Sequence, residues 1–317
     1  MEVRGFHHTS SVSARIEENA RFYTEVLGLR FVYRSINQDD VSMYHLAYGD
    51  AEAKSGAVVT FFDIPMAAPN RPGRNEVAEI SLRVPDGEAL GWWAGRFDRL
   101  GVERGEVERR YDGRERLPFR DGEEHRMSLV ADGGEGMEPG EPWTESGVPE
   151  EHAVRGIESA TLVVGSVAPT QVALVDVLGF RRAGEYATED GRVVVFESGD
   201  GGPGTEVHVV ERPGLERARP GAGSVHHIAF RVRDEAEIRR WAERVGRVGL
   251  PNSGVVDRDF FKSVYFREPN GVLFEIATDE PGWAKDGVDT LGERLVLPHF
   301  LEDRREEIER NLKPISV

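Results

Sequence analysis

Hydrophobic residues occupy alternate positions in four short segments of the chain, and such alternation is typical of a half-buried β-strand. The starts of these segments lie roughly 70–80 residues apart, within the size range of a large repeat unit or a small domain. Each segment therefore predicts a strand at the beginning of a repeated unit. The segments are 6–12, 77–84, 157–164 and 225–232.

A helical pattern follows each of these strands. Apolar residues recur at helical spacing and stop at a glycine, which commonly ends a helix. Further short apolar runs come after each glycine, so the sequence predicts a βαβββ unit that occurs four times. The last strands are least clear in the second unit, near 126–130. The four glycines are Gly28, Gly101, Gly179 and Gly246, and the clearest later strands are 43–48, 57–62, 192–196, 206–210, 263–266 and 272–276.

A run rich in glycine, proline and glutamate, residues 133–142, separates the second unit from the third. Such a composition is typical of a surface loop and marks the best domain boundary. The fold class is α+β. An amphipathic pattern from about 301 to 312, with Ile308 and Leu312, predicts a final helix that docks on the body. We expect an N-terminal domain over 1–135, a linker over 136–152, a C-terminal domain over 153–280 and a tail over 281–317.

Charge and composition narrow the classes of partner. The 317 residues carry 40 Lys and Arg against 57 Asp and Glu, a net charge of −17. This argues against nucleic acid and anionic membranes as partners, because phosphate binding needs clustered cations. The chain has no cysteine, no run of ~20 apolar residues and no secretory signal, so we expect a cytoplasmic protein. A small-molecule enzyme or a small-molecule binder remains.

Two histidine pairs stand at the same place in the first strands of units one and four. They are His7–His8 and His226–His227. Neighbouring strand residues point to opposite faces, so we expect one histidine of each pair, His8 and His227, to face a shared interior. A single strand histidine is more often a hydrogen-bonded or surface residue than a ligand. The recurrence of the pair at equivalent positions favours a site.

Glu275 lies in the apolar last strand of the fourth unit. A carboxylate in such a strand must be paired with a cation or bound to a metal, and an arginine salt bridge is the simpler alternative. Two neutral imidazoles and one carboxylate form the facial triad of non-haem Fe(II) oxygenases, which keeps coordination positions open. The equivalent place in unit one holds Thr60, a poor ligand for such an ion. The pattern therefore predicts three protein ligands with an open side.

Two more polar residues, Arg258 and Tyr265, lie around the third strand of the fourth unit. Their side chains can stabilise negative charge on a phenolate or on reduced oxygen. Arg258 could equally belong to a surface ion cluster with Asp257 and Asp259, and Tyr265 could serve packing alone. The remaining histidines are interpreted as structural or surface residues: His45, His125, His152, His208 and His299.

Together these features resemble the vicinal oxygen chelate superfamily, also called the glyoxalase/bleomycin resistance/extradiol dioxygenase proteins. The likeness is greatest to the Fe(II) dioxygenases that open hydroquinone rings. It implies that the four units form two glyoxalase-like half-barrel domains. The resemblance extends over essentially the whole chain and rests on 6–10, 225–230, Asp257–Arg258 with Tyr265, 271–275, 148–156 and the tail segments 291–293 and 297–298.

The resemblance also implies roles for individual residues. His8, His227 and Glu275 would be the metal ligands, so the first and fourth units would face each other across one cavity. The substrates would be O2 and a small aromatic diol, and the ion would be Fe(II), with Mn, Ni or Zn as alternatives. The family commonly dimerises, so a homo-oligomer is also an expectation. His226, Arg258 and Tyr265 would hold or protonate the substrate, with His7 and Ser10 nearby; Ser10 stands where threonine is expected.

Two other functions share this fold. One is a glyoxalase-type isomerase or lyase that uses Ni, Zn or Mn, and the other is an antibiotic-binding protein without catalysis. The isomerase needs a general base such as a second glutamate, which Thr60 does not supply. Binding relatives often lack the triad that this sequence retains. The ring-cleaving dioxygenase is therefore the leading hypothesis.

Overall fold

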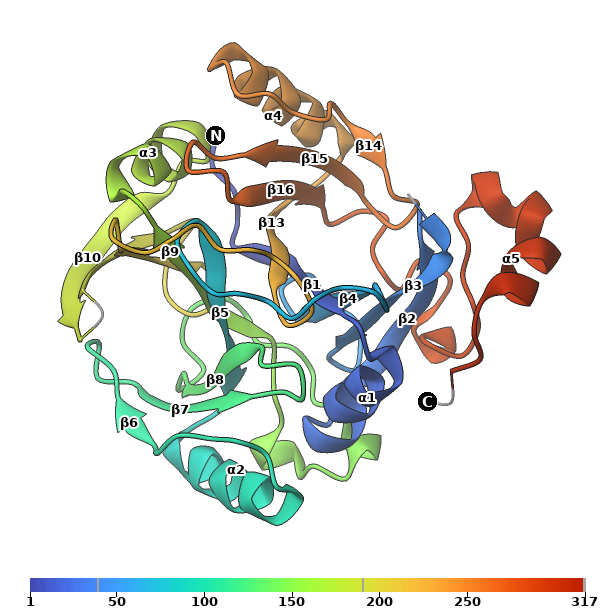
Figure 1. The fold of residues 1–317 in the computed structure, drawn as a ribbon, viewed down its shortest axis with the longest axis horizontal. Helices are drawn as coiled ribbons and strands as arrows, with labels where there is room; N and C mark the ends of the chain where they lie inside the picture. The colour runs from blue at the N-terminus through green and yellow to red at the C-terminus, as the bar shows by residue number, and fades with distance from the viewer. Residues whose placement is uncertain (39, 190, 316–317) are drawn as a thin grey trace.

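Four βαβββ units follow one another along the chain (Figure 1). The computed structural model describes residues 1–38, 40–189 and 191–315, so residues 316–317 of the expected tail lie outside the described residues. The first unit contains β1 (Phe6–Ser13), α1 (Ile16–Arg21), β2 (Arg30–Asn37), β3 (Asp40–Gly49) and β4 (Val58–Asp63). The second contains β5 (Glu76–Val84), α2 (Gly87–Leu100), β6 (Glu108–Arg109), β7 (Glu115–Arg120) and β8 (Arg126–Ala131).

The second half of the chain repeats this order. The third unit contains β9 (Ile157–Val164), α3 (Val167–Gln171), β10 (Arg181–Thr188), β11 (Gly191–Glu197) and β12 (Glu206–Glu211). The fourth contains β13 (Val225–Val232), α4 (Glu235–Arg247), β14 (Val256–Asp257), β15 (Lys262–Arg267) and β16 (Leu273–Thr278). Helices α2 and α4 lie at opposite ends of the molecule, outside the strands (Figure 1).

The two long helices begin at an aspartate. The carboxylates of Asp86 and Asp234 accept hydrogen bonds from backbone N–H groups in the first turns of α2 and α4, which satisfies donors that the helix leaves free. Gly101 ends α2 in the left-handed conformation, with φ 69°. Gly246, a predicted helix end, lies inside α4 instead. The helices of units one and three are short and continue as π-helical turns, Phe22–Val26 and Val172–Val177.

The strands form two curled eight-stranded sheets. The first sheet has the order β14-β15-β16-β13-β1-β4-β3-β2 and combines the first unit with the fourth. The second sheet has the order β10-β11-β12-β9-β5-β8-β7-β6 and combines the second unit with the third. The predicted α+β class with four βαβββ units is confirmed. Since each sheet joins strands from both sides of the linker, the domain boundaries at 135 and 153 stay a prediction.

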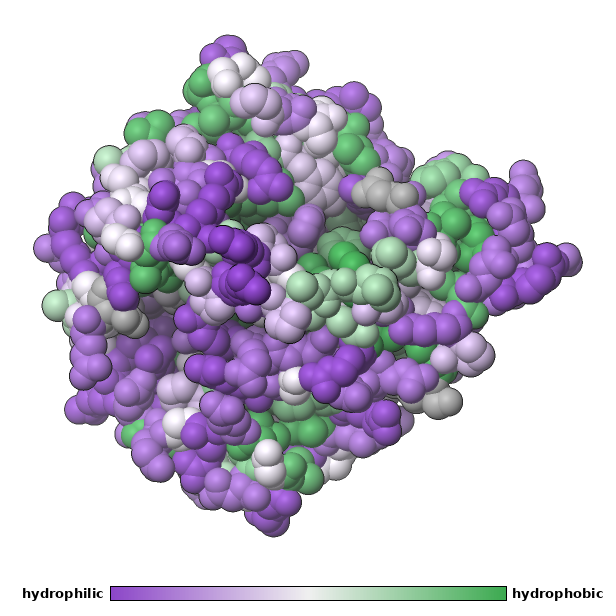
Figure 2. All heavy atoms as spheres, viewed as in Figure 1, coloured by the Kyte–Doolittle hydropathy of each residue, from purple (hydrophilic) through white to green (hydrophobic). Residues whose placement is uncertain are grey.

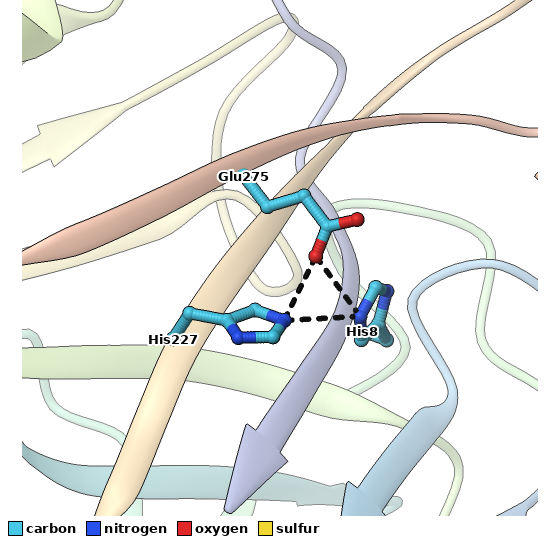
Figure 3. Close-up of side chains that lie close together, drawn as sticks. All are labelled: His8, His227 and Glu275. Atoms are coloured by element: carbon cyan, nitrogen blue, oxygen red, sulfur yellow. Dashed lines mark hydrogen bonds and ion pairs between the residues drawn. The ribbon is translucent and has the colours of Figure 1, made fainter. Parts of the chain in front are cut away.

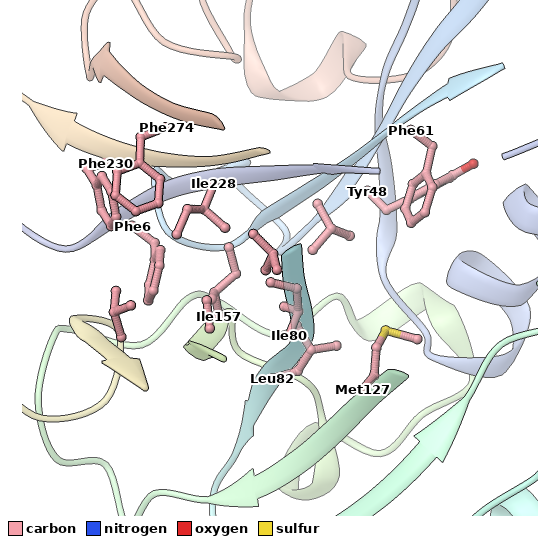
Figure 4. Packing of buried hydrophobic residues seen from close by; sticks show 14 of the residues in the cluster. Phe6, Tyr48, Phe61, Ile80, Leu82, Met127, Ile157, Ile228, Phe230 and Phe274 are labelled. Atoms are coloured by element: carbon pink, nitrogen blue, oxygen red, sulfur yellow. The ribbon is translucent and has the colours of Figure 1, made fainter. Parts of the chain in front are cut away.

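The apolar core fills the space between the two sheets (Figure 4). Both sheets turn large side chains toward this space, and each buried side chain contributes about 1.5–3 kcal/mol relative to exposure. The core therefore fixes the position of one sheet against the other. Phe6, Ile228, Phe230 and Phe274 come from the first sheet, and Ile80, Leu82, Met127 and Ile157 from the second.

The tail packs on the first unit rather than extending freely. It contains a 3-10 segment, His299–Arg304, and the helix α5, Arg305–Asn311. Ile308 is 1% exposed and Leu312 is 8% exposed. In the face shown in Figure 2 the surface is mainly hydrophilic, with small hydrophobic patches. Within the described ranges, no helix is long and apolar enough to span a bilayer.

A buried ion network fills the inside of the second sheet. Arg110 and Arg114, from the turn between β6 and β7, lie 2.7 Å and 2.6 Å from the Glu158 carboxylate on β9. Arg114 also lies 2.9 Å from the carboxylate of Glu206 on β12. Burial alone would raise the pKa of Glu158, but the two guanidinium groups, with Arg110 the stronger, lower it to about 2. Glu158 is therefore ionised and paired at neutral pH.

Replacing Glu158 by Gln should lower the free energy of unfolding by about 3 kcal/mol at pH 7, because Arg110 and Arg114 lose the fully buried carboxylate that they share. Urea denaturation measures this change. Because the pKa of Glu158 is depressed in the folded state, the difference in free energy of unfolding between wild type and Glu158→Gln is fully present above about pH 4.3. This difference shrinks as the pH falls toward about 2. The exposed Glu185, which pairs with Arg182 and Arg192, is the control, and Glu185→Gln should leave stability unchanged. Equal stability of wild type and Glu158→Gln at pH 7 would contradict this assignment.

Candidate metal centre

Three buried side chains of the first sheet converge on one point (Figure 3). The Nε2 atoms of His8 and His227 lie 3.4 Å apart. The Oε2 atom of Glu275 lies 3.3 Å from Nε2 of His8 and 2.8 Å from Nε2 of His227. The structure thus brings together the three residues that the sequence pattern selects as ligands.

Strand register explains the convergence. β1 and β13 are antiparallel neighbours, with His8 opposite Ala229, and β16 runs parallel to β13 with Glu275 opposite the same Ala229. His8, Ala229 and Glu275 therefore form one row across three strands. The alanine between them is small, which leaves room for an imidazole and a carboxylate to meet above it.

Each histidine pair sits on a β-bulge. In the pairing of β1 with β13 the register shifts twice. His7 is the extra residue of β1, between Phe6 and His8, and His226 is the extra residue of β13, between Val225 and His227. A bulge adds one residue to a strand and re-aims its side chain. As a result, Nδ1 of His7 lies 2.8 Å from Nδ1 of His8, and Nδ1 of His226 lies 2.8 Å from Nδ1 of His227. Strict alternation of faces does not hold at these positions.

The hydrogen bonds of His7 determine which nitrogen of His8 is free. Nε2 of His7 lies 3.1 Å from the carbonyl of Thr278, so it carries a proton and donates it. Burial, reinforced by the neighbouring His8, holds the pKa of His7 well below its ordinary value, so the ring is neutral and its Nδ1 is an acceptor. Nδ1–H of His8 donates to that acceptor, which leaves Nε2 of His8 with a lone pair directed at Glu275.

Glu275 completes the donor set. Its Oε1 accepts a hydrogen bond from the Ser263 hydroxyl, while Oε2 accepts no well-formed hydrogen bond although it is fully buried. Burial alone would raise the pKa of Glu275, but the imidazoles of His8 and His227 hold it well below its ordinary value. Burial also lowers the pKa of His227. An ionised carboxylate and neutral imidazoles are the states that bind a metal.

The donor spacing fits a divalent cation. Neighbouring ligands of a six-coordinate ion, with bonds of about 2.1 Å, lie about 3.0 Å apart. The three measured separations, 2.8, 3.3 and 3.4 Å, are close to this value. Three protein donors leave the other positions open, as in catalytic rather than structural sites. Two nitrogens and one oxygen suit Fe(II), Mn, Ni or Zn, so the donor set leaves the metal open.

A cavity lies beside the three donors, and His8 and His227 form part of its wall. Aromatic rings make up most of the rest, so the wall combines a large apolar surface with a few polar groups. Phe260 and Phe261, which stand close to Arg258 in the sequence, are among them. The aromatic lining consists of Tyr33, Phe62, Phe260, Phe261, Tyr265 and Trp283, and the other polar lining residues are Ser10, Asn37, Gln38, His45 and Arg258.

Arg258 and Tyr265 meet at this cavity. Nε of Arg258 donates to the Tyr265 hydroxyl at 3.2 Å, and Nη1 donates to Oε1 of Gln38 at 3.2 Å. The flanking Asp257 pairs with Lys262. Burial raises the pKa of Tyr265, so its hydroxyl stays protonated at neutral pH. The Arg258 side chain is therefore part of the cavity wall and is not simply a member of a surface cluster.

The other predicted residues take different places. Ser10 lines the cavity, and its Oγ lies 2.7 Å from Oγ1 of Thr60. His7, which is buried, and His226, which is exposed, contact the Nδ1 atoms of His8 and His227 and are not part of the cavity wall. The sequence interpretation missed His45, which lines the cavity from β3. Strand alternation alone could not find it, because the cavity face of β3 is defined only once β3 is known to pair with β4.

Replacing His7 by Phe should weaken Zn(II) binding about 10–100-fold, because His8 loses the acceptor that fixes its proton on Nδ1. His7→Gln keeps a side-chain acceptor and should bind more tightly than His7→Phe. Competition with a chromophoric chelator measures both affinities. His299→Phe, at an exposed histidine of the tail, is the control and should match wild type. Unchanged affinity in His7→Phe would contradict this role.

Comparison with known proteins agrees with this geometry. A family model described as Glyoxalase/Bleomycin resistance protein/Dioxygenase superfamily matches residues 5–129 and 156–276. MhqA of Bacillus subtilis (strain 168), named as a ring-cleaving dioxygenase, is 47% identical, and the match covers 100% of both chains. A chlorohydroquinone/hydroquinone 1,2-dioxygenase of Sphingobium indicum is 27% identical over 99% of this chain and 98% of that protein.

A solved structure extends the comparison to three dimensions. The crystal structure of a Bacillus subtilis protein described as a dioxygenase superposes with a TM-score of 0.90 at 34% identity, and the match covers 100% of this chain and 98% of that one. The two segments that the family model matches begin before β1 and β9, end within β8 and β16, and include the three converging side chains. The chain therefore belongs to the Glyoxalase/Bleomycin resistance protein/Dioxygenase superfamily.

Proposed function

We propose that the protein is an Fe(II)-dependent ring-cleaving dioxygenase that inserts O2 into a hydroquinone-like aromatic diol, next to a hydroxyl-bearing carbon. The observation that carries the proposal is the buried group of His8, His227 and Glu275 beside a cavity walled by aromatic rings. Such a donor set holds a metal by one side and leaves room for two reactants on the other. The names of the relatives support the same reaction class.

Fe(II) bound by these three residues would supply the redox chemistry that lets O2 react with an aromatic ring. The protein's part is to hold the reactants and keep water out. Trp283 and Phe261 pack against the His8 ring, at centroid distances of 5.7 and 5.3 Å. These rings make the surroundings of the donors apolar, which strengthens charge interactions inside the site.

Tyr265 and Arg258 would bind a ring oxygen of the substrate. The Tyr265 ring lies 5.6 Å from the ring of His227, next to the donors. Its hydroxyl stays protonated, and the Arg258 guanidinium beside it adds positive charge. A hydrogen bond from Tyr265 and this charge would stabilise a phenolate better than a neutral phenol.

His7 and His226 would act as positioning residues. Each contacts the Nδ1 atom of its neighbouring donor histidine, so each would keep the Nε2 lone pair of that neighbour turned toward the metal. Under this proposal neither ring touches the substrate. Proton transfer at the substrate would therefore fall to groups on the cavity wall such as Tyr265, whose ring lies 5.6 Å from that of His227.

The alternative functions find less support. A glyoxalase-type isomerase needs a second carboxylate at the metal, but Thr60 occupies that place and bonds to Ser10 and His45. No Asp or Glu is part of the cavity wall within the described ranges. A protein that only sequesters a ligand has no use for three converging donors.

Protein purified without oxygen and loaded with Fe(II) should consume O2 when hydroquinone is added, in a 1:1 ratio to the ring-opened product. Tyr265→Phe should lower kcat/KM by about 10–100-fold with iron content unchanged, because one hydrogen bond to the developing phenolate is lost. An oxygen electrode measures the O2 uptake, and the ultraviolet spectrum measures the formation of the ring-opened product.

Two controls accompany this experiment. Tyr186→Phe removes a tyrosine hydroxyl that contacts His208 in the second sheet, and it should leave the rate unchanged. Glu275→Gln should abolish both iron binding and O2 uptake. Persistent O2 uptake in Glu275→Gln, or no uptake by iron-loaded wild type with any hydroquinone, would overturn the proposed function.

A further inference from the structure

His45 forms part of the cavity wall and is held there by its neighbours. It lies on β3 opposite Phe62 of β4, and the two rings stack with centroids 4.4 Å apart and planes at 18°. Tyr33 meets the imidazole edge-on at 5.9 Å. A ring packed in this way has one preferred orientation, so its nitrogens point in fixed directions.

A hydrogen-bond chain runs from His45 into the sheet. Nε2 of His45 lies 2.9 Å from Oγ1 of Thr60, and this hydroxyl lies 2.7 Å from Oγ of Ser10. Both hydroxyls are buried, and each can donate or accept. Among the described residues His45 makes no other hydrogen bond, so Nδ1 is available to a ligand as a donor or as an acceptor.

Sheet order places His45 and Tyr265 on opposite sides of the three donors. The three donor residues lie on β16, β13 and β1, in the middle of the first sheet. Tyr265 is on β15, on one side of these strands, whereas His45 is on β3, on the other side. Phe62 lies between, with its ring 4.4 Å from His45 and 6.5 Å from His227. Hydrogen-bonding groups therefore lie on both sides of the donors, and Arg258 joins the two sides, because its Nη1 donates to Gln38 just before β3.

We propose that His45 is a substrate-binding residue that recognises the ring hydroxyl which is not bound to the metal. An ortho-diol can place both oxygens on one ion. A para-diol can place only one there, and the other oxygen, at the opposite end of the ring, needs a separate partner away from the donors. The inference rests on the proposed function and deepens it, because it names the residue that would bind the second hydroxyl of a para-diol.

The charge state of His45 suits this task. Burial, followed by the neighbouring His8 and His227, lowers the pKa of His45 to about 3, so the imidazole is neutral at neutral pH. A neutral imidazole with one nitrogen bonded to a hydroxyl offers its second nitrogen to a phenol. The Thr60 and Ser10 hydroxyls can reverse their direction, so His45 can match either a hydroxyl or a phenolate.

The test compares two ligands that differ by one hydroxyl. Anaerobic titration of the Fe(II)-loaded protein measures the Kd of hydroquinone and of phenol, without turnover. For wild type we expect hydroquinone to bind about tenfold more tightly than phenol, the ratio that one hydrogen bond in a buried site supports. In His45→Phe the ratio should fall to about one, through weaker hydroquinone binding alone. His45→Gln, which keeps a hydrogen-bonding group, should retain part of the preference.

Two more variants make the comparison specific. His208→Phe makes the same change at a buried histidine of the second sheet and should keep the wild-type ratio. Thr60→Val removes the partner of Nε2 without changing the ring on the cavity wall, and it should lower the ratio about threefold. It therefore tests the assignment even where His45→Phe does not fold.

The outcomes separate this inference from the proposed function. An unchanged tenfold ratio in both His45→Phe and Thr60→Val would overturn the role of His45, while O2 uptake with hydroquinone in wild type would leave the dioxygenase proposal standing. Equal loss of affinity for hydroquinone and phenol in His45→Phe would also overturn the role of His45, because the imidazole would then contribute only packing. Iron-loaded wild type that binds neither ring would overturn both proposals.

Discussion

The antiparallel pairing of β1 with β13 is the interaction on which the rest of the site depends. It joins the first unit of the chain to the last and sets His8 beside Ala229 in the middle of the first sheet. The neighbouring β16 then adds Glu275 to the same row. A one-residue change of register would turn these side chains to the other face of the sheet. The core between the two sheets stabilises this pairing, because Phe6 and Phe230 of the same strands belong to it.

The donor group is costly for the folded protein until a cation is present. A carboxylate oxygen without a hydrogen bond and two imidazole nitrogens face one another in a buried place. Unpaired polar atoms of this kind destabilise a fold, and their retention is typical of functional sites. In the second sheet, by contrast, Glu158 is paired with Arg110. The two sheets have the same topology, but among the residues that the structure describes only the first sheet brings such a set of donors together.

Much of this arrangement could be predicted from the sequence, for physical reasons. The four units follow from apolar periodicity, and the donors follow from the recurrence of a histidine pair at equivalent positions. The bulges could not be predicted, because a one-residue insertion in a ladder has no signature in a single strand. His45 and Trp283 were missed for a related reason. They reach the cavity through the pairing of β3 with β4 and through the packing of the tail, which local patterns do not encode.

X-ray absorption spectroscopy of the protein with one equivalent of Fe(II), prepared without oxygen, tests the central claim most directly. We expect a single iron site with two imidazole nitrogens and one carboxylate oxygen from the protein, completed by oxygen ligands from solvent. Addition of an aromatic diol should then change the ligands from solvent and leave the three protein donors in place. A site with four or more protein donors, or iron bound away from His8, His227 and Glu275, would contradict it.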